Sequence, residues 1–255
     1  MNTFSSDQIS SRHRTSIGVL LVHGLNGSRH DLKELENLLL SSGLCAENML
    51  LPGHGTYVQE MLSVGWSDWA QAVLDELRLL KERRAIVFMV GHSLGAALVL
   101  HIAAHEPVAG VVALCPPLRL HPLLLQTVQM ARYITPYTPV LWEDIRDPVA
   151  RRRSPATSYR WTALAPVESM LRFLPVLRTE LPLIKVPAMI MNAKYDHIVP
   201  ARDGREIFHL LGSQEKELIT LHRSYHEVMK DYERDQVFAK ILEFITKNSL
   251  CLASE

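Results

Sequence analysis

One short stretch constrains the fold of this 255-residue chain more than any other. The apolar run at residues 85–90 is followed at once by Gly-His-Ser-Leu-Gly at 91–95, and then by the apolar residues 96–100. This pattern predicts a buried strand, a sharp turn and a helix, with Ser93 at the apex of the turn. Glycine suits such a turn for two reasons. Neighbouring backbone segments approach each other closely, and without a Cβ the residue can adopt dihedral angles that are strained for other residues. The Ser93 hydroxyl would then be accessible, next to the unpaired N–H groups of a helix N-terminus.

The alternation of predicted strands and helices indicates an α/β fold class. Short apolar runs bounded by turn residues predict strands at residues 17–23, 45–51, 85–90, 108–114, 187–192 and 217–221. Amphipathic segments predict helices at residues 29–41, 68–84, 201–211 and 232–247. Ser28 and Ser67 are the candidate N-caps of the first two helices. Because strands that alternate with helices are typical of parallel sheets, we expect a mostly parallel sheet with helices on both faces.

The regular alternation is interrupted between residues 118 and 181, a stretch that is rich in aromatic residues and prolines. We interpret it as a small, mainly helical cap inserted between the first part of the core at 1–117 and the second part at 182–255. The alternative is an ordinary pair of crossover helices with long loops. The length of the segment favours the cap, because crossover connections are usually far shorter.

The charge balance of the chain argues against two classes of partner. The 27 basic and 27 acidic residues give a formal net charge of zero. Nucleic acids and anionic membranes both select for a basic face, so we expect neither as the main partner. The dense basic cluster at residues 151–153 is interpreted as a solvated helix face or a local salt-bridge partner. A small-molecule substrate is expected instead.

The termini and the cysteines are typical of a reduced, cytoplasmic enzyme. Residues 1–16 are polar and contain no leader-like apolar stretch. No segment reaches the ~18 uninterrupted apolar residues of a bilayer span, so no stable membrane insertion is predicted. The cysteines, Cys45, Cys115 and Cys251, are odd in number and lack metal-ligand spacing. We expect them to remain reduced, as is usual in the cytoplasm.

A serine hydroxyl is a weak nucleophile at neutral pH and needs a base to take its proton during attack. In chains with this turn, the acid follows the serine and the histidine comes last, each just beyond a late strand. Asp196 follows the predicted strand that ends at 192, and His226 follows the one that ends at 221. His226 is therefore the candidate general base. Asp196 would fix the tautomer of its imidazole and stabilise the transient cation.

Three other residues compete for these roles. His222 is nearer the strand end, where its ring would pack or face solvent. Asp203 lies in the first turn of a predicted helix, where a carboxylate is favourable without any catalytic role. His197, beside Asp196, is interpreted as an exposed loop residue.

The attack would create an oxyanion, which preorganised N–H groups stabilise. One donor should be the backbone N–H of Leu94, directly after the serine. The second should come from the loop after the first strand, residues 23–28, where the N–H of Leu25 is our candidate. The Pro-Gly turn at residues 52–55 would shape the floor of the site without doing chemistry.

A metal site and a cofactor site are not predicted. His101 and His105 stand four residues apart on the helix that follows Ser93 and could in principle bind a metal. The spacing lacks the glutamate and the third ligand of a zincin. Histidines near a helix C-terminus are also explained by the helix dipole.

At these residues the chain resembles the α/β-hydrolase superfamily over nearly its whole length. Within that superfamily it is most similar to small bacterial carboxylesterases and monoacylglycerol lipases. The resembling segments are residues 23–27, 53–55, 68–69, 91–95, 107–112, 196 and 224–235. The resemblance implies serine-dependent hydrolysis of carboxylic esters without a metal or organic cofactor, under a small lid that forms the acyl pocket.

The leading hypothesis is therefore a hydrolase of short- to medium-chain acyl esters that forms an acyl-enzyme on Ser93. The same triad could instead serve a thioesterase, a lactonase, a C–C hydrolase or an acyltransferase. A third hypothesis is a non-catalytic protein that uses the capped pocket as a receptor. Dehalogenases and epoxide hydrolases are excluded, because their nucleophile is an aspartate. If His226 is the base, kcat/KM should rise with pH through an ionisation near the ordinary histidine value of ~6.5.

Overall fold

In the described part of the chain, six parallel strands form the central sheet. The computed structural model describes residues 16–119, 123–140, 144–153 and 159–252, so the polar segment expected at 1–15 lies outside them. The strand order is β2-β1-β3-β4-β7-β8. The strands are β1 (Ile17–Val22), β2 (Cys45–Asn48), β3 (Ile86–His92), β4 (Gly110–Leu114), β7 (Ala188–Ala193) and β8 (Lys216–Leu221). All neighbouring pairs are parallel, which confirms the predicted α/β class.

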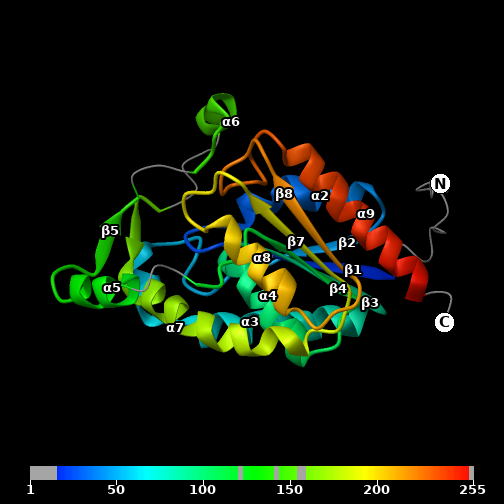
Figure 1. Ribbon diagram of the computed structural model, residues 1–255, viewed down its shortest axis with the longest axis horizontal. Helices are drawn as coiled ribbons and strands as arrows, with labels where there is room; N and C mark the ends of the chain where they lie inside the picture. The colour runs from blue at the N-terminus through cyan, green and yellow to red at the C-terminus, as the bar shows by residue number, and fades with distance from the viewer. Residues whose placement is uncertain (1–15, 120–122, 141–143, 154–158, 253–255) are drawn as a thin grey trace.

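Helices cover both faces of the sheet (Figure 1). On one face lie α2 (Lys33–Ser41) and α9 (Arg234–Leu252); on the other lie α3 (Trp66–Arg83), α4 (Leu94–His105) and α8 (Ala201–Leu210). Successive strand residues point to opposite faces, so Val19 and Leu21 join the core under α2 and α9. Leu20 and Val22 join the core under α3 and α4. The apolar runs of the sequence are continuous for this reason: both sides of each strand are buried.

Two helices begin elsewhere than the sequence predicts. The N-cap of α3 is Gly65 rather than Ser67, because the Asp68 carboxylate accepts the N–H of Gly65 at 2.7 Å. α9 begins at Arg234 rather than at residue 232, because Glu233 binds the loop before it instead. A side-chain partner thus moves each boundary by two residues.

The first helical segment begins as predicted but in a tighter form. Ser28 is its N-cap: the Ser28 hydroxyl accepts the N–H of His30, and the Asp31 carboxylate accepts the N–H of Ser28 at 2.7 Å. The first turn is a 3₁₀ helix, η2 (Arg29–Leu32), which leads directly into α2.

Two strands, β2 and β4, are shorter than predicted by at least two residues. β2 ends at Asn48 because the chain then turns inward, where the N–H of Leu51 donates to His23 Nε2 at 3.1 Å instead of to a neighbouring strand. β4 begins only at Gly110, although the N–H of Ala109 already donates to Val87.

Residues 118–181 contain, in their described part, three helices and one short antiparallel strand pair. The helices are α5 (Leu124–Arg132), α6 (Pro148–Arg153) and α7 (Leu164–Glu180), and the strands are β5 (Tyr137–Pro139) and β6 (Trp161–Ala163). The strand pair was not predicted, since three-residue strands carry no detectable alternation. α5 and β5 lie at the end of the molecule away from α9 (Figure 1). α7 instead runs back against α3 and α4, where Phe173 and Leu177 are fully buried.

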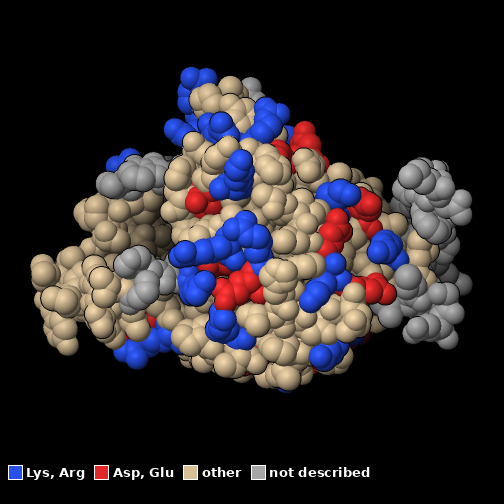
Figure 2. All heavy atoms as spheres, in the orientation of Figure 1, with Lys and Arg blue, Asp and Glu red and all other residues tan. Residues whose placement is uncertain are grey.

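The surface over α8 carries charges of both signs. Figure 2 shows basic and acidic side chains side by side there. Glu206 of α8 pairs with Arg119 at 3.2 Å and also with Arg178. No helix in the described part of the chain combines the length and the apolar character that crossing a bilayer requires.

The topology brings four loops to one edge of the sheet. Because the strands are parallel, their carboxyl ends meet at the same edge, which carries the loops after β1, β3, β7 and β8. The chain leaves β1 toward β2 but leaves β3 toward β4, so the first two loops diverge and a crevice opens between them. Ser93 stands at this crevice, directly after β3.

Candidate active site

The turn at Ser93 has the strained geometry that its sequence predicts. Ser93 has φ 54° and ψ −117°, a left-handed conformation that side chains rarely adopt. A Cβ on Gly91 would stand 2.2 Å from the carbonyl oxygen of Gly95. A Cβ on Gly95 would stand 2.1 Å from the carbonyl oxygen of Val22 in β1. Both positions therefore admit only glycine, and the close packing fixes the apex that presents the serine.

The three residues predicted as a triad lie in hydrogen-bonding contact. Ser93 Oγ is 2.9 Å from His226 Nε2, and His226 Nδ1 is 2.7 Å from Asp196 Oδ2. Since an ionised carboxylate only accepts, Nδ1 carries the proton and Nε2 is free to accept from the serine hydroxyl. The other oxygen of Asp196 accepts the N–H groups of Ile198 and Val199 at 2.8 and 2.7 Å. The tautomer needed by a general base is thus built into the contacts.

Electrostatic interactions shift the pKa values of His226 and Asp196 in opposite directions. Burial by itself lowers the pKa of His226, but the charge and hydrogen bond of Asp196 outweigh it and hold that pKa well above 6.5. Burial acts to raise the pKa of Asp196, yet the opposing effects of His226 and two backbone N–H groups keep it below the usual value. The sequence analysis placed this ionisation near 6.5 without a buried carboxylate partner; with that partner, we expect the ionisation at a higher pH.

The backbone of His226 is held from two sides by residues that the sequence analysis did not assign. His92 Nε2 donates to the carbonyl of His226 at 3.0 Å. Burial lowers the pKa of His92, which keeps its ring neutral in this packed position. Asp144 Oδ2 accepts the N–H of His226 at 3.1 Å. His92 is the first variable position of the Gly-x-Ser-x-Gly turn, so its proximity to His226 could have been inferred; nothing in the sequence indicated Asp144.

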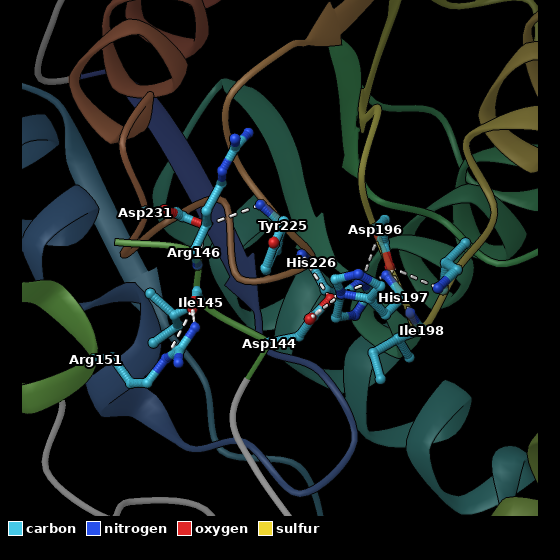
Figure 3. A network of polar contacts seen from close by, with 11 residues as sticks. Asp144, Ile145, Arg146, Arg151, Asp196, His197, Ile198, Tyr225, His226 and Asp231 are labelled. Carbon is cyan, nitrogen blue, oxygen red and sulfur yellow. Dashed lines mark hydrogen bonds and ion pairs between the residues drawn. The ribbon is translucent and has the colours of Figure 1, made fainter. Parts of the chain in front are cut away.

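Asp144 also binds the loop that carries Asp196 (Figure 3). Its Oδ2 accepts the N–H of His197 at 3.0 Å, and its Oδ1 accepts from the His197 ring at 2.6 Å. The Asp144 side chain is buried, whereas the His197 side chain is half-exposed. One carboxylate from the 118–181 segment thus joins the loop after β7, which bears Asp196, to the loop after β8, which bears His226.

A second carboxylate, Asp231, binds the same segment just after Asp144 (Figure 3). It accepts the N–H groups of Arg146 and Asp147 at 2.7 and 2.9 Å, and that of Tyr225 at 2.8 Å. Arg151 of α6 donates to the carbonyl of Ile145 between them. The position of His226 therefore depends on a segment that lies about eighty residues earlier in the chain.

We expect Asp144→Ala to lower kcat about 10- to 100-fold with little change in KM, because displacing a base by about 1 Å costs this much. The backbone N–H groups of His197 and His226 would also lose their acceptor. Each loss should lower the free energy of unfolding by about 1–3 kcal/mol, so the melting temperature should fall. Asp144→Asn keeps an acceptor oxygen and should lose less. Steady-state kinetics and thermal melts check this, with the exposed Asp235→Ala as the matched control. Unchanged kcat in Asp144→Ala would show that the contact does not position the base.

The competing residues occupy other places. His222 is exposed, and its N–H donates to Glu233 rather than to any group of the triad. Asp203 is buried on α8, where its carboxylate accepts the N–H groups of Leu118 and Arg119 at 2.9 Å each. Burial raises the pKa of Asp203, and its role is to hold the start of the 118–181 segment. His197 is exposed as predicted, but it also lines the cavity beside Ser93.

The two predicted oxyanion donors lie on the loops that flank the serine. A Cβ on Gly24 would be 3.1 Å from Ser93 Cβ, so the loop after β1 contacts the serine directly. Leu25 of that loop lines the cavity. Within the described residues, the N–H groups of Leu25 and Leu94 have no hydrogen-bond acceptor. Both are therefore available to a substrate oxygen.

A cavity of about 530 Å³ opens in front of Ser93 and His226. Its apolar wall comes partly from the 118–181 segment, which contributes Leu124, Val140, Val167 and Met170. The polar wall is formed by Asn26, Asp31, Asp144, Thr162, His197 and Glu227. Asn26 donates to Thr162 at 2.6 Å and so links the loop after β1 to β6. The turn at 52–55 contributes no lining residue; its His54 is buried against His23 and Trp69, beneath the loop after β1.

Within the described residues, one metal-compatible group lies inside this site: His92, Cys115 and His226. Both ring nitrogens of His226 already contact Asp196 and Ser93. Burial raises the pKa of Cys115 to about 11, so its sulfur is a thiol rather than a thiolate ligand. This group therefore does not suit a metal ion.

The comparison with protein families agrees with this geometry. Residues 14–233 match the model of the family described as serine aminopeptidase, S33, which covers most of the chain. The chain belongs to this family of α/β-hydrolases. The predicted resemblance is thereby confirmed at the level of family and fold.

Several known proteins are similar to this chain along most of its length. The thermostable monoacylglycerol lipase of Bacillus sp. (strain H-257) is 29% identical over 91% of this chain and 92% of its own. The carboxylesterase of Bacillus subtilis (strain 168) is 25% identical, over 90% of this chain and 92% of its own length. A solved structure from work on the metagenome-derived lipolytic enzymes LipS and LipT is 30% identical, covers 91% of this chain and 94% of its own, and superposes with a TM-score of 0.86.

Proposed function

We propose that this protein is a serine hydrolase of carboxylic esters with short- to medium-chain acyl groups. The observation that carries the proposal is the continuous contact of Ser93, His226 and Asp196 at the floor of a partly apolar cavity. The similar proteins named monoacylglycerol lipase and carboxylesterase support the choice of esters.

The chemistry proceeds through an acyl-enzyme. Ser93 Oγ adds to the carbonyl carbon while His226 Nε2 takes its proton, and the imidazolium is stabilised by Asp196. The N–H groups of Leu25 and Leu94 receive the oxyanion. His226 then returns the proton to the leaving alcohol as the carbon–oxygen bond breaks. A water molecule repeats the sequence on the acyl-enzyme, and the acid is released with Ser93 restored.

The segment 118–181 is proposed as the lid that encloses the acyl chain. Four of its apolar residues line the same cavity as Ser93, and three buried carboxylates, Asp144, Asp203 and Asp231, hold it on the core. Closing an apolar wall over the site would exclude bulk water and strengthen the hydrogen bonds to the oxyanion. The polar wall, with Asp31 and Glu227, would face the alcohol part of the ester.

A panel of substrates tests the proposal. We expect kcat/KM to be highest for p-nitrophenyl butyrate to octanoate and to fall for palmitate, since a cavity of about 530 Å³ is in the range that encloses small ligands. Monoacylglycerols of the same chain lengths should also be cleaved. Initial rates on esters, on lactones and on matched acyl thioesters measure the preference. A strong preference for thioesters, or no turnover of any ester, would contradict the proposal.

The cellular setting proposed is the reducing cytoplasm. Cys45 and Cys115 are both free thiols, and Cys115 is fully enclosed in the core. Thiols of this kind are typical of proteins that fold under reducing conditions.

A further inference from the structure

Outside the catalytic cavity, the C-terminal ends of α4 and α7 bring two histidines and a glutamate together. His101 Nδ1 is 2.6 Å from Glu180 Oε2, and His105 Nε2 is 3.0 Å from Glu180 Oε1. One potential ligand atom from each residue lies within 4.8 Å of the other two. The sequence showed only the histidine pair, because Glu180 is 75 residues beyond His105 and reaches it only through the packing of α7 on α4.

The three side chains are arranged as ligands on a rigid frame. His101 and His105 are four residues apart on α4 and therefore project from one face of the helix. The His101 ring is packed edge-on against Trp66 and Phe173, at centroid distances of 5.7 and 5.4 Å, which fixes its direction. His101 and Glu180 are mostly buried, whereas the His105 side chain is 50% exposed. An ion could thus enter from solvent on the His105 side and keep water ligands there.

The charge of Glu180 is not matched by a permanent cation. Among the described residues, its ion-pair partners are His101 and His105, and no lysine or arginine pairs with it. A mostly buried carboxylate that faces only imidazoles is a favourable place for a positive ion, because its charge is poorly compensated by solvent.

We propose that His101, His105 and Glu180 form a binding site for a divalent transition-metal ion, of which Zn²⁺ is the representative. Two imidazole nitrogens and one carboxylate oxygen are a ligand set that suits Zn²⁺, with water at the fourth position. Tetrahedral ligand atoms about 2.0–2.1 Å from Zn²⁺ stand about 3.3 Å apart. The 2.6 Å contact of His101 with Glu180 would therefore open by about 0.7 Å, and the 3.0 Å contact of His105 by about 0.3 Å. Each coordinating ring nitrogen must give up any proton that it carries, either to the other nitrogen of the same ring or to water.

The role of this site is structural rather than catalytic. His101 and His105 lie about two and three helical turns from Ser93, or roughly 12 and 18 Å along α4. The ion could therefore not contact a substrate at the serine. It would join the helix that begins at the nucleophile to α7, whose first half lines the cavity through Val167 and Met170. Binding would stabilise the folded chain and fix that wall.

Titration of the full chain with ZnSO₄ tests the site. Calorimetry should give one ion per chain, and at a Zn²⁺ concentration of 100 times Kd the melting temperature should rise by roughly 5–10 °C. His105→Ala, at a half-exposed position that folding does not require, should weaken binding at least tenfold and remove the shift. His101→Ala should weaken binding as well. His209→Ala, which removes an exposed histidine at the end of α8, is the matched control and should bind Zn²⁺ as the wild type does.

Two results would overturn the site. Absence of binding to the wild-type chain would show that the three ligands do not hold an ion. Equal Zn²⁺ affinity in the wild type, His105→Ala and His101→Ala would place any bound ion elsewhere, including the group around His226. Visible absorption of the Co²⁺-loaded chain gives a second readout, since loss of the d–d bands in His105→Ala reports on the ligands directly. Metal-free ester hydrolysis by His105→Ala should equal that of the wild type, which separates this site from the catalytic one.

Discussion

Ser93→Ala is expected to lower kcat for ester hydrolysis by roughly a millionfold, the loss found when the serine of a triad is removed. The physical reason is that the Ser93 hydroxyl, 2.9 Å from His226 Nε2, is the proposed nucleophile, and alanine has no group that could attack the acyl carbon. The residual rate would come from the oxyanion donors and from substrate binding, which the substitution leaves in place. Hydrolysis of p-nitrophenyl butyrate measures the loss.

Labelling by a fluorophosphonate probe provides an independent measurement, because the probe forms a covalent bond with an activated serine. Wild-type protein should be labelled and Ser93→Ala should not. Ser67→Ala, at an exposed position in the first turn of α3, is the matched serine control and should behave as the wild type. A melting temperature close to that of the wild type would establish that Ser93→Ala is folded. Full turnover by Ser93→Ala would eliminate the proposed mechanism.

Asp196→Asn is expected to lower kcat about 10⁴-fold, because an amide can donate to His226 Nδ1 and so favour the wrong tautomer. Its second expected effect is on the pH profile. In the wild type, only neutral His226 can accept the serine proton, so kcat/KM rises as the pH rises through the pKa of His226. Asp196 raises that pKa above 6.5, which places the rising limb above pH 6.5. Without the carboxylate, the lowering effect of burial remains, and the limb should move to lower pH.

Rates measured from pH 5 to 10 on one substrate check both effects. The exposed Asp75→Asn on α3 is a suitable control, since it removes one charge far from the triad. A wild-type limb at or below pH 6.5 would show that Asp196 does not stabilise the imidazolium. An Asp196→Asn limb at the wild-type position would point to another group as the origin of the ionisation.

The sequence predicted the parts of the site that depend on local rules. The strand, the glycines and the helix around Ser93 are adjacent in the chain, so steric limits alone specify the strained turn. Asp196 and His226 were found from their order and from the strands before them, because parallel strands end at one edge whatever their sequence separation. The continuous apolar runs likewise indicated strands buried on both faces.

The contacts that hold the base in place were not predictable in the same way. Asp144 meets His226 across 82 residues, and Asp231 binds the segment that carries Asp144. A carboxylate in a polar loop looks the same in sequence whether it faces solvent or accepts buried N–H groups. The short strands β5 and β6 were missed for a similar reason, since each pairs only with the other and neither has a periodic pattern.

The amino-acid sequence by itself therefore determined the α/β class, the nucleophile turn and the three residues proposed for catalysis. Each of these follows from local sterics or from the alternation of buried strands with helices. Tertiary structure alone decided which polar side chains meet: Asp144 with the two catalytic loops, and Glu180 with His101 and His105. The physical reason is that packing between distant segments brings each charged side chain to its partner, and the residues adjacent in the sequence do not indicate which partner that is.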